Sequence, residues 1–500
     1  MKKYISVIAV LFAVGIAGCK KDYLSQEKNP NQPSVNTPDL ALSSTLVSDA
    51  NVLQGSYPEF GVWGGYWTTS GNYVPNQALN EYQLTTNNYT GVWDQLYLNL
   101  SNWNTLQGLA KTSGSGNYQA IAMIMKAFDF EQLVDNFNNV PYSQAFDSKN
   151  LTPAYDKGSD IYIDLGKQLD AAIVLINSST AGLAPSTADV MFGGDMTQWK
   201  KFANTIKLRL AIHTSSNPGS SAAFAALKAS MAAHNGEGYL DADAVVQPGF
   251  TGANATSGAS QESPFYGVYG FDVTGNATFG YQYYRANAYA VKFYLDNNDP
   301  RAAAFYAPTD VGGIIQGNIF GDILHNNQNP ATSAIGTGLL AAPTQPAILF
   351  SGAEAAFLQA EAIQNGIITV PPGATYATAQ AAYEGGITLS FESLGLTDAQ
   401  AATYYGQAIN NVGWASSTNK QQAILVQKWA SLNGLFNLEA YNEYRRTGIP
   451  ALPSSVDPAA LGTTLPTRIL YPASELSTNA GQLGKEGTIS PLTSKIFWAK

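Results

Sequence analysis

Two stretches of the sequence gather aromatic rings among glycine, asparagine, serine and threonine. In the first, residues 55–84, the rings around Gly64 and Gly65 follow neither helical nor strand periodicity. An aromatic ring can stack on the C–H face of a sugar while a neighbouring amide, such as that of Asn72 or Asn76, bonds its hydroxyls. The residues of this stretch that we expect to contact a ligand are Trp63, Tyr66, Trp67 and Tyr73.

The second aromatic stretch, residues 264–294, adds a positive charge to its rings. A guanidinium group can bond sugar hydroxyls or pair with a ligand carboxylate. A third stretch, residues 312–346, is rich in Gly, Asn, Ala and Thr, and loops of that length are usually functional or mobile. The expected ligand contacts of the second stretch are Tyr281, Tyr283, Tyr284 and Arg285.

These residues also have purely structural interpretations. Trp63 and Trp67 could fill the core above the underlying helices, since Trp and Tyr side chains are usually largely buried. Arg285 could form a surface salt bridge or stack on a ring in a structural role. The sequence leaves both interpretations open.

Catalytic chemistry finds little support in the sequence. His213, His234 and His325 are scattered without metal-ligand spacing, and no Cys–His or Gly-x-Ser-x-Gly arrangement occurs. Paired carboxylates could hydrolyse glycosides, but the acidic residues in recognisable places lie within helical patterns, where surface pairing, capping or interhelical hydrogen bonds are the expected roles. Those residues are Asp135, Glu354, Glu361, Glu439 and Glu443. We therefore predict a non-enzymatic protein without a cofactor or a metal site of its own side chains, and the sequence leaves open a single structural cation among loop carbonyls.

The N-terminus has the pattern of an exported lipoprotein. Lys2 and Lys3 precede an apolar run of about a dozen residues, too short to span a bilayer. Cys19 is the only cysteine, and residues 16–19 resemble a lipobox, in which the cysteine is acylated. We expect a signal peptide over residues 1–18 and a lipid-anchored polar tether over residues 19–38. The alternative is a buried free thiol in an uncleaved helix.

The composition excludes nucleic acid as a partner. The formal net charge is −10, whereas a nucleic-acid surface must be basic to neutralise phosphate. Charged residues make up only 12% of the sequence, against about 25% in a typical globular chain. Neutral polar groups must therefore provide solubility, and such a surface suits neutral polar ligands.

Apolar side chains at three- and four-residue spacing predict a mainly helical protein. Asn433-Gly434 predicts a turn in a helical hairpin over residues 419–452, and Gly448 with Pro450 predicts its end. Arg445 and Arg446 lie in the last turn, where cations suit the helix dipole. Repeated helix pairs with small–large spacing suggest tetratricopeptide-like units. The other predicted helices cover residues 39–53, 91–110, 117–137, 160–176, 198–213, 222–233, 352–364 and 376–394.

Several motifs, in order along the chain, resemble the SusD/RagB family of outer-membrane nutrient-binding lipoproteins, nearest its SusD-like 2 branch. The motifs are Asp22-Tyr23-Leu24, Val140-Pro141-Tyr142, Trp199-Lys200-Lys201-Phe202, Asp299-Pro300-Arg301, Phe357-Leu358-Gln359-Ala360-Glu361-Ala362, and Glu439 through Pro450. One departure is Phe137-Asn138-Asn139, where the family usually has Tyr-Gly-Asp, which puts a role for that acidic position in doubt.

The resemblance implies an all-α, tetratricopeptide-like scaffold in a single domain over residues 39–500. Long irregular insertions, with short β-hairpins in places, would face the ligand at about residues 55–84, 248–290 and 308–346. It further implies a surface-exposed lipoprotein of the outer membrane that captures glycan for a SusC-like TonB-dependent transporter. Peptide capture is the alternative within the family, and a glycan-acting enzyme or a helical-repeat adaptor lies outside it.

Overall fold

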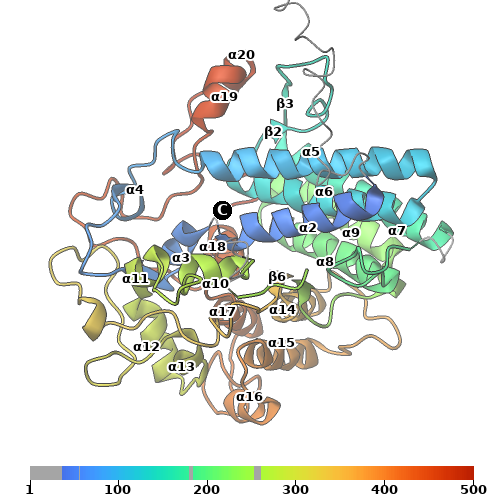
Figure 1. Cartoon of the computed structure of the whole chain (residues 1–500). Coiled ribbons are helices and arrows are strands. Elements are labelled where there is room, and N and C mark those ends of the chain that lie inside the picture. The colour runs from blue at the N-terminus through green and yellow to red at the C-terminus, as the bar shows by residue number, and fades with distance from the viewer. Residues whose placement is uncertain (1–36, 56, 180–183, 253–260) are drawn as a thin grey trace, which may run out of the picture.

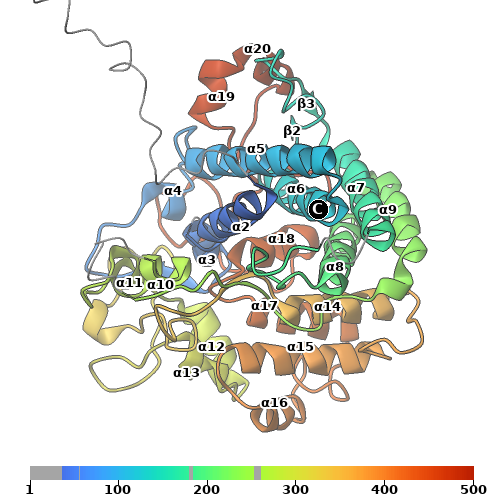
Figure 2. The same cartoon turned by 45° about the vertical axis from the view of Figure 1, so that its right-hand side comes forward.

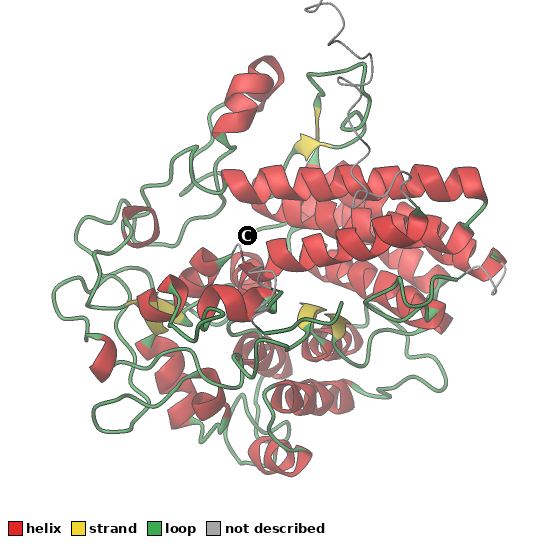
Figure 3. Ribbon diagram, in the orientation of Figure 1, coloured by secondary structure: helices red, strands yellow, loops and turns green. Residues whose placement is uncertain are grey.

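The computed structural model describes residues 37–55, 57–179, 184–252 and 261–500. Helices dominate these residues, and the strands are few and short (Figure 3). The expected all-α class is confirmed. The predicted signal peptide, Cys19 and all but the last two residues of the tether lie outside the described residues.

The N-terminal half forms a stack of paired helices. Successive helices pack on each other from α5 to α9, and α2 lies on α5 (Figure 1). Gly114, at a φ of 72°, closes the tight turn between α5 and α6, a conformation that glycine adopts without steric cost. These helices are α2 (Pro38–Gly55), α5 (Thr90–Ser113), α6 (Gly116–Phe137), α7 (Gly158–Ser178), α8 (Met196–Thr214) and α9 (Ser221–Ala233).

A second group of helices comes from the C-terminal part of the chain. α15 packs on α14 and α16, and α18 lies on the side of this group that faces the N-terminal stack (Figure 2). Asn419 caps α17 by accepting a hydrogen bond from the Gln422 amide at 3.0 Å, and Gly448 ends α18 at a φ of 76°. The group comprises α14 (Gly352–Gln364), α15 (Ala379–Ser393), α16 (Asp398–Tyr405), α17 (Lys420–Ser431) and α18 (Asn437–Thr447). The predicted hairpin and its turn are confirmed.

Short elements lie in the predicted insertions, between the longer helices and near the C-terminus. The helices are α3 (Pro58–Trp63), α4 (Gln77–Asn80), α10 (Pro264–Tyr269), α11 (Phe279–Tyr283), α12 (Ala288–Asp296), α13 (Arg301–Phe305), α19 (Ala473–Thr478) and α20 (Ala480–Leu483), with 3₁₀ turns η3 (Pro218–Ser220), η4 (Asn235–Glu237), η5 (Asn329–Ala331) and η6 (Gly484–Glu486). The strands form three antiparallel pairs: β1 (Trp67–Thr69) with β5 (Tyr284–Ala286), β2 (Val140–Pro141) with β3 (Tyr155–Asp156), and β4 (Ala244–Val246) with β6 (Ala347–Phe350). Two of these pairs join distant segments and are therefore not the expected hairpins.

Buried ion pairs join the two helix groups. On α8, Arg209 contacts Glu131 of α6 at 2.8 Å and Glu354 of α14 at 3.3 Å. Lys428 of α17 contacts two carboxylates of α18, Glu439 at 2.7 Å and Glu443 at 3.2 Å. All of these side chains are buried. The expected interhelical role of these carboxylates is confirmed for Glu354, Glu439 and Glu443.

Arg446 extends this ionic network from α18 to α14. Its guanidinium bonds both oxygens of Glu361, at 2.9 and 2.8 Å, and Oε2 of Glu443 at 2.6 Å. His213 of α8 lies 3.1 Å from Glu439, and Glu439 with the neighbouring carboxylate of Asp135 raises the pKa of its imidazole against the opposing effect of burial. The sequence predicted that Arg446 stabilises the helix dipole, but its main contacts are the buried carboxylates of Glu361 and Glu443.

The Arg446→Met substitution is expected to lower the free energy of unfolding by about 3–5 kcal/mol, because Glu361 would keep a buried charge without a cationic partner. Urea unfolding measures the loss. The control is Lys292→Met, which breaks the exposed Lys292–Asp296 pair and should cost less than about 0.5 kcal/mol. Equal losses in both variants would contradict a stabilising role for the buried network.

Candidate ligand-binding site

A short strand pair brings the two predicted aromatic stretches together. β1 and β5 pair antiparallel, with Trp67 opposite Ala286, Thr68 opposite Arg285 and Thr69 opposite Tyr284. More than 200 positions separate these partners along the chain, as the Thr69–Tyr283 separation of 214 illustrates. The two aromatic stretches, expected as separate loops, therefore meet in one region of the structure.

The third predicted insertion joins the same region. The Gly71 amide donates to the Asn327 carbonyl at 3.0 Å, and the Ala286 amide donates to the Ser333 carbonyl at 2.9 Å. A Cβ at residue 71 would clash with the carbonyl oxygen of Asn326, so this crossing requires glycine. We refer to residues 67–76, 279–287 and 316–333 as the loop cluster.

Amide side chains hold the loop cluster together. Asn72 Oδ1 accepts a hydrogen bond from the Asn329 amide at 2.7 Å, and Asn318 Nδ2 donates to the Thr69 carbonyl at 3.2 Å. Asn76 caps α4 by accepting from the Ala78 amide at 2.9 Å. The oxygens of Asn72 and Asn76, which the sequence suggested as ligand contacts, thus fix the loops themselves.

Three of the predicted ligand contacts are core residues. The rings of Trp63, Tyr66 and Trp67 have no exposed surface. Tyr66 stacks on Trp429 of α17 with 5.2 Å between ring centroids and donates to the Trp429 carbonyl at 2.5 Å, and Trp63 Nε1 donates to the Leu79 carbonyl at 3.2 Å. In this structure the expectation of exposed stacking platforms is wrong for these three residues, because α3, β1 and the turn between them direct the rings inward.

An exposed ring that our expected contacts omit stands in the loop cluster. Phe279, the first residue of α11, is 66% exposed. The ring of Tyr283 lies nearly parallel behind it at 5.1 Å, and Tyr73 meets it edge-on at 5.7 Å. Thr278 starts α11 by accepting from the Tyr281 amide at 3.2 Å, which fixes the orientation of this turn.

The predicted residues Tyr73 and Tyr283 act as supports for that ring. Tyr283 is only 6% exposed, and its hydroxyl accepts from the Asn76 amide at 3.1 Å. The half-buried Tyr73 donates to Gln282 Oε1 at 3.0 Å. Both rings are therefore held in place from the rear, so Phe279 can present a fixed face to a ligand.

The predicted residues Tyr281, Tyr284 and Arg285 follow Phe279 along the chain, in α11 and β5. Tyr281 is half-buried and packs on Phe271 at 4.8 Å, whereas Tyr284 packs on Trp67 at 5.6 Å. Tyrosine hydroxyls are protonated at neutral pH, and burial raises the pKa of both residues further, so both hydroxyls can donate hydrogen bonds.

Arg285 is 6% exposed but has unused hydrogen-bond donors. Its Nε donates to Asn329 Oδ1 at 2.9 Å, and its guanidinium lies 5.8 Å from the Tyr281 ring centroid. Within the described residues, its two terminal nitrogens have no hydrogen-bond partner. Burial lowers the pKa of the guanidinium, but arginine remains charged at physiological pH.

Several of the acidic residues noted in the sequence lie in two buried clusters with His213. Glu131, Asp135 and His213 come close enough to hold a metal ion, as do His213, Glu439 and Glu443. Both sets are buried and already border the cations Arg209 and Lys428. These acids serve the ionic network between helices rather than a solvent-accessible site.

The chain matches the family model SusD-like 2, described as starch-binding and associating with the outer membrane, over residues 30–472. It belongs to that family. No curated protein matches the chain. Among the described residues, no helix is both long and apolar enough to cross a membrane.

Solved structures share the fold of this SusD-like protein. A chitin-binding protein is 23% identical with a TM-score of 0.75, covering 93% of this chain and 100% of the other. A chitin-binding SusD homolog from Flavobacterium johnsoniae is 23% identical with a TM-score of 0.70, covering 91% and 98%. A SusD-like protein from Bacteroides thetaiotaomicron is 21% identical with a TM-score of 0.71, covering 92% and 98%.

The inward orientation of Trp63 can be tested through stability. Trp63→Ala should lower the free energy of unfolding by about 3–5 kcal/mol, since it removes a fully buried ring. Phe279→Ala should cost less than about 1 kcal/mol, because most of its ring is exposed. Chemical denaturation followed by circular dichroism provides both values. A small loss for Trp63→Ala, matching that for Phe279→Ala, would contradict the assignment.

Proposed function

We propose that the protein captures an oligosaccharide or polysaccharide at the cell surface and that the loop cluster is the binding site. The main observation that supports this proposal is the exposed Phe279 ring, which Tyr73 and Tyr283 hold in a fixed orientation. The family description as starch-binding supports a glycan ligand, as do two chitin-binding proteins of the same fold.

Each part of the loop cluster has a physical task in such binding. A sugar ring would stack on Phe279, while the terminal nitrogens of Arg285, which have no partner among the described residues, would bond its hydroxyls. The hydrogen bonds of Asn72, Asn318 and Gly71 order the loops before the ligand arrives, which reduces the entropy lost on binding. No bond in the ligand needs to break, so the activity is capture rather than catalysis.

The captured glycan would pass to a SusC-like TonB-dependent transporter, for which this protein acts as a hinged lid. Membership of the family supports this partner. The loop cluster also exposes large apolar side chains, with Val74 at 88% and Leu324 at 81%, and exposed apolar groups often mark protein contacts. Acylated Cys19 would hold the protein to outer-membrane lipid through the tether of residues 19–38.

The binding site can be tested by isothermal titration of the mature chain with chito-oligosaccharides, malto-oligosaccharides and short peptides. Phe279→Ala should weaken oligosaccharide binding about fivefold, corresponding to about 1 kcal/mol of lost stacking. Phe279→Trp should preserve binding, because indole offers a larger stacking face. Leu151→Ala, which removes an 84% exposed side chain outside the loop cluster, should leave it unchanged.

Two results would contradict the proposal. Unchanged oligosaccharide affinity in Phe279→Ala would remove the loop cluster as the site. Binding of peptides without binding of any oligosaccharide would instead favour the peptide-capturing alternative, in which backbone hydrogen bonds replace stacking.

The proposed anchor can be tested with Cys19→Ser. This variant should move from the membrane fraction to the soluble fraction after cell lysis, because it lacks the thiol that lipid attachment requires. Fractionation followed by immunoblotting measures the distribution, with the wild-type chain as control. A variant that stays with the membrane to the wild-type extent would refute lipid anchoring at Cys19.

A further inference from the structure

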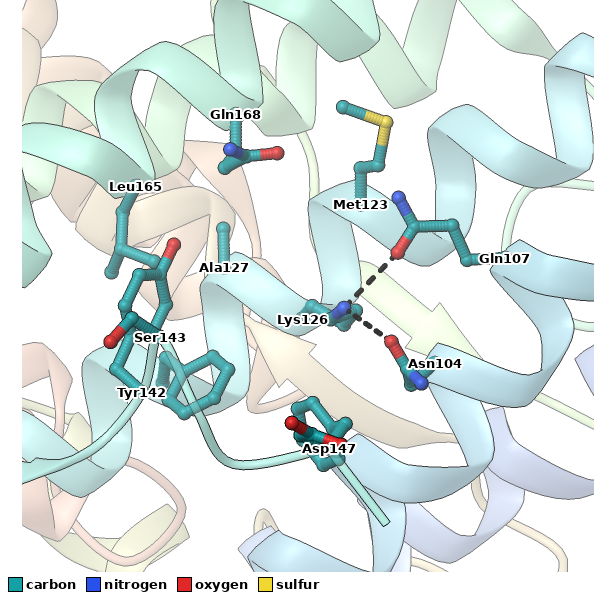
Figure 4. A pocket seen from close by; sticks show the side chains of 12 residues that line it. Asn104, Gln107, Met123, Lys126, Ala127, Tyr142, Ser143, Asp147, Leu165 and Gln168 are labelled. Atoms are coloured by element: carbon teal, nitrogen blue, oxygen red, sulfur yellow. Dashed lines mark hydrogen bonds between the residues drawn. The ribbon is translucent and has the colours of Figure 1, made fainter. Parts of the chain in front are cut away.

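A second candidate binding site is a cavity in the N-terminal helix stack. Its volume is about 310 Å³, within the lower range of small-ligand pockets. Helices α5, α6 and α7 and the segment after β2 line it, and none of its lining residues belongs to the loop cluster (Figure 4).

Lys126 of α6 carries the positive charge of this cavity. Its Nζ donates to Asn104 Oδ1 at 3.0 Å and to Gln107 Oε1 at 3.1 Å, both on α5 (Figure 4). The ammonium also lies 5.2 Å from the ring centroid of Phe146. An ammonium has three N–H donors, so one remains for a further acceptor.

Among the described residues, the half-buried Lys126 has no counter-charge, unlike two fully buried lysines. The fully buried Lys207 contacts Asp170 at 2.7 Å, and the fully buried Lys428 contacts Glu439 at 2.7 Å. Within the described part of the chain, no carboxylate lies within ion-pair distance of Lys126, and burial alone lowers the pKa of its amine. A partly buried cation without an anion costs free energy that a bound carboxylate would recover.

The other walls suit a sugar ring. Tyr142 packs edge-on against Phe130 at 4.7 Å, and its hydroxyl donates to Asp164 at 2.6 Å, so the ring is fixed. Gln168 adds an amide from α7. The exposed Asp147 brings one negative charge to the lining, which disfavours multiply charged anions such as phosphate and can accept hydrogen bonds from hydroxyls.

We propose that this cavity binds a sugar unit bearing a carboxylate, a hexuronic acid, with the carboxylate on Lys126 and the sugar ring against Tyr142 and Phe146. The hydroxyls then face the amide of Gln168 and the carboxylate of Asp147. The protein thus has an acidic-sugar site separate from the loop cluster.

The test is isothermal titration of the mature chain with glucuronate and galacturonate, against the matched neutral sugars glucose and galactose and against acetate. At least one hexuronate should bind at least about tenfold more tightly than its neutral counterpart and than acetate. Lys126→Gln should remove that preference. Lys111→Gln, which removes an exposed charge on α5, should leave it unchanged.

Gln107→Glu keeps the proposal testable if Lys126→Gln does not fold. It places a carboxylate beside the Lys126 amine with almost no change in side-chain shape. The variant should therefore unfold at a higher temperature and lose hexuronate binding, because the new carboxylate occupies the position of the ligand's.

The proposal would be overturned by no hexuronate binding at millimolar concentration, by equal binding of hexuronate and hexose, or by hexuronate binding that survives Gln107→Glu. Binding of an acidic peptide in place of hexuronate would also overturn it. Because the cavity shares no residue with the loop cluster, the result of the hexuronate titrations does not depend on the result of the oligosaccharide titrations.

Discussion

Buried charges at the centre of the helix assembly constrain the rest of the structure. Glu439, Glu443 and Arg446 of α18 lose their water on folding, and their charges are balanced only when α8, α14 and α17 supply His213, Glu361 and Lys428, respectively, in the right places. A misplaced helix would leave an unpaired buried charge, which costs several kcal/mol. The network therefore stabilises one arrangement of helices that come from distant parts of the chain.

The rigid centre in turn positions the surface loops. Trp429 of α17 stacks on Tyr66, and its Nε1 donates to the Gly64 carbonyl at 2.8 Å, so the first insertion is attached directly to the helix that carries Lys428. β1 follows this attachment point and aligns β5 beside it. The buried aromatic residues thus anchor the loops, while Phe279, at the start of α11, presents its ring to solvent. Anchoring and ligand contact are divided between different rings.

The sequence predicted the helices well because their signals are local. α14 has the predicted bounds, and Gly448 ends α18 as its lack of a Cβ suggests. The sequence could not distinguish the aromatic rings that anchor the loops from the rings that are exposed. The Tyr66 hydroxyl bonds a carbonyl 363 positions away, and no local pattern carries that information. Likewise, the Phe279 ring is supported by Tyr73, which comes from another insertion. The prediction for Arg446 considered only the dipole of its own helix, because its partner Glu361 lies on the distant helix α14.

The central claim, that ligand binds where the three insertions meet, is tested most directly by hydrogen–deuterium exchange with and without the best-binding oligosaccharide. Binding at the loop cluster should slow exchange of amides in residues 67–76, 279–287 and 316–333 together, because their backbones are hydrogen-bonded to one another. The helices of the buried network should exchange equally slowly in both states. Protection confined to another surface, with these three segments unchanged, would contradict the account.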